Sequence, residues 1–439
     1  MNLKTKRLLG MAAYLLLIFL PLIVLIVFPM PPGRDFWRDF SVALGYVGLA
    51  MAGMQFLPTA RLRFASDLFD MDRLYKMHHY LSVVSVILVL LHPMILVFNN
   101  PSTLLLLNPL TAPWRAQAGL IGLGGLLLIG ITSVLRKEVK LGYDAWHGLH
   151  DLLAMAIAVF ALIHIFKVNY YTATPAMTAV WIGQAFIWAG MTVYMRILKP
   201  LQLMRQPYTV ERVITETPDT WTVVLKPDGH EGLDFNPGQV AWISINRSPF
   251  GLHRNPFSIS GSAHRKDELR FSIKALGDFS SSIGELKGGE RVYVDGPFGS
   301  FTLENPRTQK GLALLAGGIG AAPIMSILHT MEDSSDQRPV YLFYGNYDEE
   351  NIIFREELER LKKKLNLKII YVLEKAPPGK QYEQGFITRE MLERTLPENY
   401  EELYYFVCGP LPMIEAMQKH LEGMDVSDWQ ISTEKYEMA

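Results

Sequence analysis

The stretch from His78 to Pro93, HHYLSVVSVILVLLHP, has two histidines at the start of a mostly apolar run and a third near its end. An imidazole is costly to bury in hydrocarbon without a partner, and ionisable groups at membrane depth are candidates for function by default. On an ideal helix His78 and His92 lie within roughly 40° of one face and about 21 Å apart along the axis. His79 and His92 would differ by roughly 140°. The spacing therefore pairs His78 with His92.

A second apolar run, WHGLHDLLAMAIAVFALIHIF, repeats this spacing with His150 and His164, while His147 falls on a different face. A single metal cannot join histidines about 21 Å apart on one helix. Two haem groups, each held by one histidine from each helix, would use all four side chains. The predicted inner haem is held by His78 and His150, and the outer haem by His92 and His164. The alternative is that these histidines cap helices or form interhelical hydrogen bonds, but the duplicated interval favours haem.

Apolar stretches long enough, or nearly so, to cross a bilayer cover about residues 8–30, 40–57, 80–98, 116–135, 152–166 and 176–197. Lys and Arg cluster near residues 4–7, 61–76, 136–140 and 196–205, in alternate connections. This pattern predicts a multi-pass membrane protein with both termini in the cytoplasm. We expect residues 1–204 to form a six-helix transmembrane domain.

Composition excludes several other classes of protein. The 439 residues carry a net charge of −1 and no basic stripe, so no nucleic-acid partner is expected. The single cysteine, Cys408, excludes an internal disulfide and a cluster held by four cysteines. Charged residues crowd the second half, which predicts a membrane part joined to a soluble part.

Short β-rich runs follow from about residue 207 and predict a small antiparallel barrel over residues 205–306. Within it, the motif NPFS offers Phe257 to an aromatic ring and Ser258 to a hydroxyl or phosphate. Downstream, backbone N–H groups at the start of a short helix would suit a pyrophosphate. Each piece alone is equally typical of an ordinary strand and a capped helix. The candidate cofactor-binding residues of this region are Asn255, Pro256, Phe257, Ser258, Lys274, Gly277, Ser280 and Ser281.

Residues 311–328 read as a buried strand, a glycine turn and a helix, a layout that holds dinucleotide phosphates. Pro323 stands where the third glycine of the common G-x-G-x-x-G fingerprint would be. Two later strands end at Gly345 and at Cys408, which predicts a parallel sheet over residues 307–439 with its ligand at the carboxyl ends. Cys408 is either a core thiol or a neighbour of the nicotinamide. The candidate nucleotide-binding residues are Gly317, Gly318, Gly320, Pro323, Gly345, Gly409 and Pro410.

This order of parts resembles the NADPH oxidase and ferric reductase superfamily, in its prokaryotic form, along nearly the whole chain. The family's haem-ligand pattern coincides with His78, His92, His150 and His164. Its flavin motif, His-Pro-Phe-Ser or His-Pro-Phe-Thr, coincides with residues 255–258, where Asn255 replaces histidine. Its Gly-Gly-x-Gly-x-x-Pro turn and its Cys-Gly-Pro motif coincide with residues 317–323 and 408–410. The aromatic residue that covers the flavin would be Tyr436.

The resemblance implies that cytosolic NAD(P)H reduces FAD, which passes electrons through two haem b groups to an acceptor outside. After FYGN, where relatives selective for NADPH carry Arg, this chain has Tyr347 and then an acidic run, so NADH or dual use stays open. Oxygen is the favoured acceptor, because no Cys, Met or acidic metal patch marks the outer loops. The anionic product would be stabilised by Arg38, Arg34 or Arg115.

Other acceptors and one other class of protein stay open. A ferric chelate, a quinone or a periplasmic partner would replace oxygen, and a nucleotide-sensing transporter would contain no haem. The chain has no calcium-binding loop and no polybasic or Pro-rich tail, so no obligatory protein activator is expected. Its short loops suit a bacterial inner membrane.

Overall fold

Long apolar helices make up the first half of the chain. The computed structural model describes residues 3–28, 31–62, 65, 68–69, 71–136, 138–140, 142–251, 254–303 and 310–435. Two compact units, Met1–Pro200 and Leu201–Ala439, divide the chain. Among the described residues, six helices are long and apolar enough to cross a membrane: α1 (Leu3–Val27), α2 (Phe36–Met54), α5 (Met71–Asn99), α6 (Trp114–Val134), α7 (Tyr143–Val168) and α8 (Pro175–Val193). The six predicted spans are thus confirmed.

Two of these helices, α5 and α7, begin well before the predicted apolar runs. The structure starts α5 at Met71 and α7 at Tyr143, whereas hydropathy predicted starts near Tyr80 and Leu152. Hydropathy marks the part of a helix that contacts lipid, and a helix continues until a cap or breaker ends it. As a result His78 and His150 lie inside regular helix.

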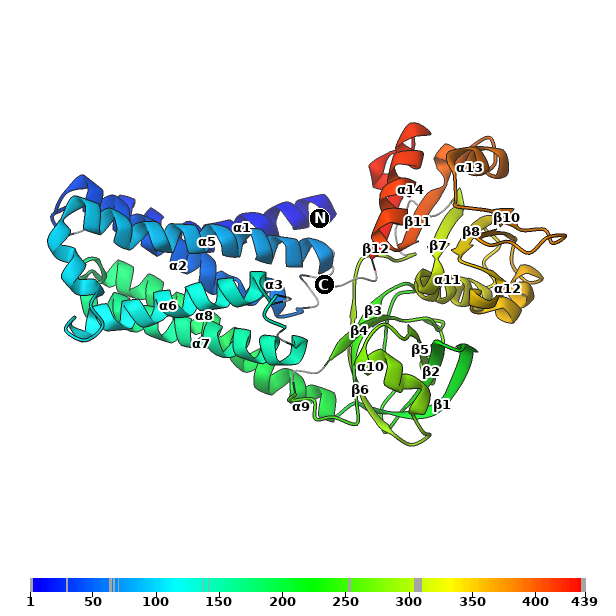
Figure 1. Ribbon diagram of the computed structural model, residues 1–439, viewed down its shortest axis with the longest axis horizontal. Helices are drawn as coiled ribbons and strands as arrows, with labels where there is room; N and C mark the ends of the chain where they lie inside the picture. Colours follow the sequence, from blue (N-terminus) through cyan, green and yellow to red (C-terminus); the bar gives the residue numbers. More distant parts are fainter. Residues whose placement is uncertain are drawn as a thin grey trace. The chain divides into compact units, whose positions relative to one another are not determined.

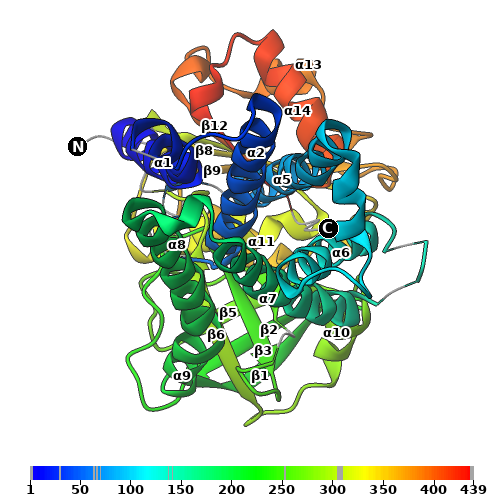
Figure 2. The same ribbon diagram turned by 90° about the vertical axis from the view of Figure 1, so that its left-hand side faces the viewer.

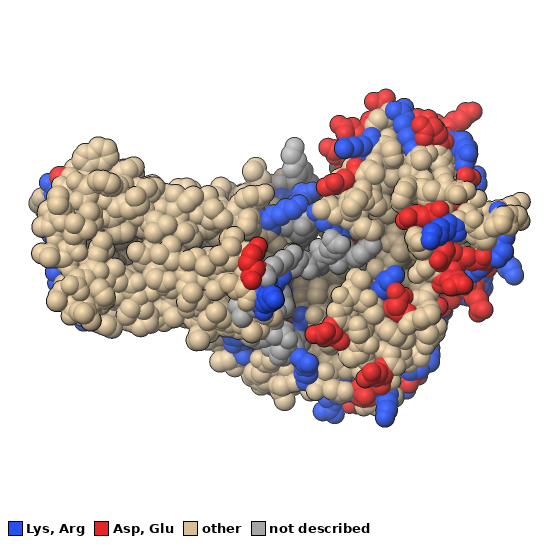
Figure 3. All heavy atoms as spheres, viewed as in Figure 1, with Lys and Arg blue, Asp and Glu red and all other residues tan. Residues whose placement is uncertain are grey.

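The helices pack in pairs. In the first unit α2 lies along α5, and α6 lies along α7 (Figure 2). Asp35 caps α2 by accepting a hydrogen bond of 3.0 Å from the Arg38 N–H, and Asn169, in the left-handed conformation, ends α7. The outward faces are apolar, and between its ends the helical face shown in Figure 3 has almost no charged side chains. This surface suits lipid.

The second unit begins with a curled antiparallel sheet. Its strand order is β4-β3-β6-β1-β2-β5, and an isolated bridge between Ile259 and Phe271 links the chain after β4 to β5. Phe271 and Ile243 are fully buried inside the curl. The strands are β1 (Pro207–Thr217), β2 (Thr220–Pro227), β3 (Val240–Ile245), β4 (Asn255–Ser258), β5 (Leu269–Lys274) and β6 (Arg291–Phe298).

A parallel sheet follows in the order β10-β9-β8-β7-β11-β12 (Figure 1). Helices α11 (Ala321–Asp333) and α12 (Arg355–Lys362) cover one face, and α13 (Arg389–Thr395) and α14 (Leu411–Gly423) cover the other. The central strands are buried on both faces, which explains their unbroken apolar sequences. The strands are β7 (Leu312–Gly317), β8 (Val340–Asn346), β9 (Leu367–Leu373), β10 (Glu383–Gln384), β11 (Tyr404–Gly409) and β12 (Ile431–Lys435).

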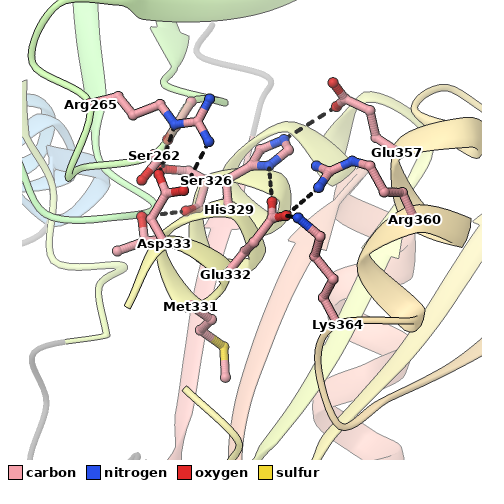
Figure 4. Close-up of polar contacts among 12 residues, drawn as sticks. Ser262, Arg265, Ser326, His329, Met331, Glu332, Asp333, Glu357, Arg360 and Lys364 are labelled. Carbon is pink, nitrogen blue, oxygen red and sulfur yellow. Dashed lines mark hydrogen bonds and ion pairs between the residues drawn. The ribbon is translucent and has the colours of Figure 1, made fainter. Parts of the chain in front are cut away.

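Helix α11 joins the two sheets through polar contacts (Figure 4). The buried Ser326 hydroxyl donates to the Gly261 carbonyl at 2.8 Å, and Arg265 forms an ion pair with Asp333 at 2.9 Å. On its other side, His329 Nε2 lies 3.2 Å from a Glu357 carboxylate oxygen of α12. These contacts hold the glycine turn that precedes α11 at a defined place beside the curled sheet.

Candidate functional site

The four intramembrane histidines form two facing pairs. The ring centroids of His78 and His150 lie 6.2 Å apart, and those of His92 and His164 lie 6.4 Å apart. Both pairs join α5 to α7. His79 is exposed and its ring contacts Tyr80. The structure therefore brings together the histidines that the spacing selected.

The separation of the rings suits a shared metal. A metal–imidazole bond measures about 2 Å, and each ring nitrogen lies about 1.1 Å from its ring centre, so two imidazoles that shared one metal would have centroids up to about 6.2 Å apart. Two imidazoles hydrogen-bonded directly to each other would have centroids about 5 Å apart. The residues present thus fit a haem iron held between the rings of each pair better than they fit direct hydrogen bonding.

Backbone carbonyls orient the outer histidines. His164 Nδ1 lies 2.7 Å from the Arg115 carbonyl oxygen of α6. His92 Nδ1 lies 3.0 Å from the Ser41 carbonyl oxygen of α2 and 2.9 Å from the Ser41 hydroxyl oxygen. The Ser41 hydroxyl donates to the His92 carbonyl at 2.8 Å. With Nδ1 as the donor, the Nε2 lone pair of each ring is left for a metal.

The inner pair has different neighbours. Ser133 Oγ lies 3.4 Å from His150 Nδ1, and the Trp146 ring lies 5.2 Å from the His150 ring. The guanidinium of Arg136 stacks 5.2 Å from the Trp146 ring. One residue beyond His150, Asp151 pairs with Arg196. Cations and an aromatic ring therefore lie next to this pair.

A cavity in the second unit lies between its two sheets. One wall comes from the curled sheet and the other from the carboxyl ends of β7, β11 and β12. The predicted residues that line it are Pro256, Phe257, Ser258, Lys274, Gly320, Pro323 and Cys408. Sequence motifs that are far apart in the chain thus meet at one cavity, with the flavin candidates facing the nucleotide candidates.

In the cavity wall formed by the parallel sheet, the backbone at Gly320 closely approaches the backbone at Cys408. A Cβ on Gly320 would lie 2.2 Å from the Cys408 carbonyl oxygen, so only glycine fits there. The strand order reverses between β7 and β11, and ligands of open parallel sheets bind at such switch points. Gly317 and Gly409 end β7 and β11 at this edge, and Gly345 is the last residue but one of β8.

Cys408 is a buried thiol at the end of β11. Burial raises its pKa well above the ordinary value, and the negative charge of Glu434 raises the pKa further. The group is therefore a protonated thiol at neutral pH. Glu434 lies opposite Cys408 in the β11–β12 register, and it lines the cavity together with Lys435. Sequence reasoning missed both residues, although their position at a strand end just before Tyr436 was a usable signal. Tyr436 itself lies outside the described residues.

Several predicted residues lie beside the cavity rather than in its wall. Gly277 caps the four-residue helix α10 (Asp278–Ser281), and its N–H donates to the Ser280 hydroxyl at 2.9 Å. The Gly277 N–H thus bonds within the loop. Asn255 pairs with Ile243 in the sheet. The other described residues of the prediction that do not line the cavity are Ser280, Ser281, Gly317, Gly318, Gly345, Gly409 and Pro410.

An acidic side chain holds the cations that follow β8. Glu349 accepts hydrogen bonds from Lys380 at 2.6 Å, from Arg355 at 2.5 Å and from Tyr382 at 3.0 Å. Hydrogen bonds from Lys380 and Arg355 lower the pKa of Glu349 to about 2. The sequence showed the acidic run, but it did not show that this carboxylate pairs with two cations.

Comparisons with known proteins match both halves of the chain. Residues 44–161 match the family described as ferric reductase like transmembrane component, and residues 314–419 match the oxidoreductase NAD-binding domain. NADH-cytochrome b5 reductase 1 of Lodderomyces elongisporus is 40% identical over 146 residues, which cover 33% of this chain and 48% of the relative. The reductase component of propane 2-monooxygenase from Mycolicibacterium smegmatis is 30% identical over 233 residues, 51% of this chain and 65% of the relative.

The chain spans about half the length of the curated relatives it matches. Among solved structures, the FAD/NAD-binding domain of nitric oxide dioxygenase from Vibrio cholerae covers 53% of this chain and 98% of its own, with 22% identity and a TM-score of 0.46. The chain therefore joins a ferric reductase-like transmembrane component to an oxidoreductase NAD-binding domain, the combination that matches the NADPH oxidase and ferric reductase superfamily.

Proposed function

We propose that the protein carries electrons from cytoplasmic NAD(P)H through FAD and two haem b groups to an acceptor on the outer side of the membrane. The proposal rests on the two pairs of histidines that face each other between α5 and α7. Their ring centroids lie 6.2 Å and 6.4 Å apart, which suits one iron between the rings of each pair. Residues 1–204 form the haem part in this proposal, residues 205–306 the FAD part and residues 307–439 the nucleotide part.

Flavin chemistry converts a hydride into single electrons, and haem groups carry those electrons one at a time. This chain's residues bind and orient the reactants. Phe257 and Ser258 face the flavin from β4, while the turn at Gly320 holds the nicotinamide nucleotide. The protonated Cys408 fills the wall of the cavity without acting as a nucleophile, because its pKa is raised.

NADH is the proposed donor. An acidic residue after the neighbouring strand of a parallel dinucleotide-binding sheet favours a ribose hydroxyl, whereas free cations favour the extra phosphate of NADPH. Glu349 already binds Lys380 and Arg355 at this place. The names of similar relatives, NADH-cytochrome b5 reductase and NADH nitrate reductase, agree with this donor.

Oxygen, reduced to superoxide, is the proposed acceptor. Arg38 lies three residues before Ser41, whose carbonyl contacts His92, and Arg115 supplies the carbonyl that contacts His164. The helix turn that contacts His92 therefore carries Arg38, and the helix turn that contacts His164 carries Arg115. A fixed positive charge stabilises an anionic product as it forms.

A ferric chelate is the second candidate, favoured by the family match of residues 44–161. The outer carboxylates give it less support, because both hold hydrogen bonds within the protein. Asp35 accepts from Asn99 Nδ2 at 2.9 Å, and Asp39 accepts from the Tyr171 hydroxyl. Neither carboxylate is an evident docking point for a bare metal ion.

Anaerobic addition of NADH to the purified, FAD-supplemented protein tests the proposal. We expect the spectrum of two low-spin haems to become reduced, and superoxide dismutase-sensitive dye reduction to follow when oxygen is admitted. Haem that stays reduced in oxygen but is reoxidised by ferric citrate would move the assignment to ferric chelates. A purified protein with no haem band would overturn the electron path.

A further inference from the structure

The helix pairs α2–α5 and α6–α7 share one local arrangement: a helical carbonyl contacts a histidine, and a glycine follows that carbonyl by four residues. In α2 the Ser41 carbonyl contacts His92 Nδ1, and four residues later stands Gly45. In α6 the Arg115 carbonyl contacts His164 Nδ1, and four residues later stands Gly119. A helical carbonyl accepts the N–H of the residue four positions on, and the Cβ of that residue tilts toward it. A side chain at the glycine position would therefore stand between the carbonyl and an approaching ring.

The distances show how closely each ring lies on its glycine. A Cβ on Gly119 would lie 2.8 Å from His164 Nδ1 and 3.1 Å from His164 Cε1. A Cβ on Gly45 would lie 3.1 Å from His92 Cγ and 3.3 Å from His92 Nδ1. Favourable contacts between heavy atoms are about 3.5–4.0 Å long. Gly119→Ala must therefore displace the imidazole of His164, and Gly45→Ala must move that of His92 by a few tenths of an ångström.

A second glycine in each helix also faces the histidine helix, and the contact at Gly48 is the tighter of the two. Gly48 and Gly122 each follow the first glycine by three residues, in GYVG and GLIG. A Cβ on Gly48 would lie 2.9 Å from Val89 Cγ2 of α5, and one on Gly122 would lie 3.6 Å from the Ala161 nitrogen of α7. The pairs α2–α5 and α6–α7 are therefore two copies of one arrangement that brings a histidine against a bare helix carbonyl.

We propose that Gly45 and Gly119 are positioning residues for the outer haem. By leaving the Ser41 and Arg115 carbonyls uncovered, they let each histidine donate from Nδ1, which turns Nε2 toward the iron and makes the imidazole a more basic ligand. The inference rests on the proposed haem function. In it, two glycines that have no side chain determine how both outer histidines are oriented. The inner His150 Nδ1 lies 3.4 Å from the Ser133 hydroxyl, a longer contact than the contact of either outer histidine with its carbonyl.

Alanine substitutions in the full-length chain test the proposal. Gly45→Ala and Gly119→Ala are compared with Gly124→Ala and Gly130→Ala, which lie in α6 where an added Cβ meets nothing within 4 Å. Haem content and spectroelectrochemical titration of both haems are measured, with a His92→Ala protein identifying the outer haem signal. We expect the control variants to keep both haems and both midpoint potentials. Gly45→Ala and Gly119→Ala should lose the outer haem, halving haem content, or raise only its midpoint potential.

If Gly45→Ala and Gly119→Ala had the same outer-haem content and midpoint potential as the control variants, the proposed role of the glycines would be wrong. The proposed haem function would still stand. Wild-type protein without haem would instead overturn the proposed function. Replacement of His164 by Nδ1-methylhistidine gives a second test that leaves the helices unchanged, because the methyl group removes the Nδ1 donor and keeps Nε2. We expect the same loss or shift of the outer haem, and an unaltered outer haem would contradict the proposal.

Discussion

Arg265 Nε and Nη2 each donate a hydrogen bond of 2.9 Å to a carboxylate oxygen of Asp333, and this bidentate pair ties the curled sheet to α11 (Figure 4). The Arg265 side chain is 53% exposed, so the pair contributes at most about 1 kcal/mol. The nearby Ser326 hydroxyl is fully buried, and its loss leaves the Gly261 carbonyl without this donor.

We therefore expect Ser326→Ala to destabilise the second unit by about 1–2 kcal/mol, and Arg265→Ala by less than about 1 kcal/mol. Thermal unfolding of the full-length protein, followed by flavin fluorescence, measures both. Arg389→Ala, which breaks an exposed pair with Glu393 within α13, is the matched control. If Arg265→Ala lost more stability than Ser326→Ala, the buried hydroxyl would not be the more important of the two contacts.

Glu332 makes the stability of the second unit sensitive to acid. Burial alone raises the pKa of Glu332, but hydrogen bonds from Arg360 and Lys364 outweigh burial and hold the pKa at about 2, below its ordinary 4.5. The carboxylate therefore stabilises the fold fully above about pH 4.5, and this stabilisation is lost as the pH falls toward 2. Between about pH 5 and pH 3, the Tm of Glu332→Gln should fall less steeply than that of the wild type. Parallel curves would show that this ion pair does not set the acid response.

Glu349 should decide the choice of nucleotide. In Glu349→Gln the side chain no longer neutralises Lys380 and Arg355, and both cations become available to a phosphate. We expect kcat/KM for NADPH to rise several-fold relative to NADH, measured as ferricyanide reduction by the full chain. Glu350→Gln, one residue along, is the control and should leave the ratio unchanged. Equal ratios in both variants would assign the preference to other residues.

The outer histidines should be separable from flavin chemistry. His92→Ala or His164→Ala should halve the haem content and abolish electron delivery to oxygen, while NADH still reduces FAD. His79→Ala should keep both haems, because His79 is exposed and its ring contacts Tyr80. Loss of haem in His79→Ala would overturn the pairing of His78 with His150.

Cys408 should resist alkylation in the folded protein. Its thiol is buried and its pKa is raised, first by burial and then by the charge of Glu434, so little thiolate forms even at pH 9. We expect iodoacetamide to label the chain only after unfolding, as followed by mass spectrometry. Rapid labelling of the native protein at neutral pH would show an accessible thiolate instead.

Local patterns in the sequence determined the six spans, the two kinds of sheet and the choice of His78 over His79, because hydropathy and helical period act within one element. Only the tertiary structure showed the ring separations, the contact of Ser41 with His92 fifty-one residues away, and the pairing of Glu349 with Lys380 thirty-one residues away. Glu434 was identified as a site residue only from the strand pairing that places it opposite Cys408. Such contacts depend on how helices and strands pack, and packing brings together residues whose spacing in the chain carries no periodic signal.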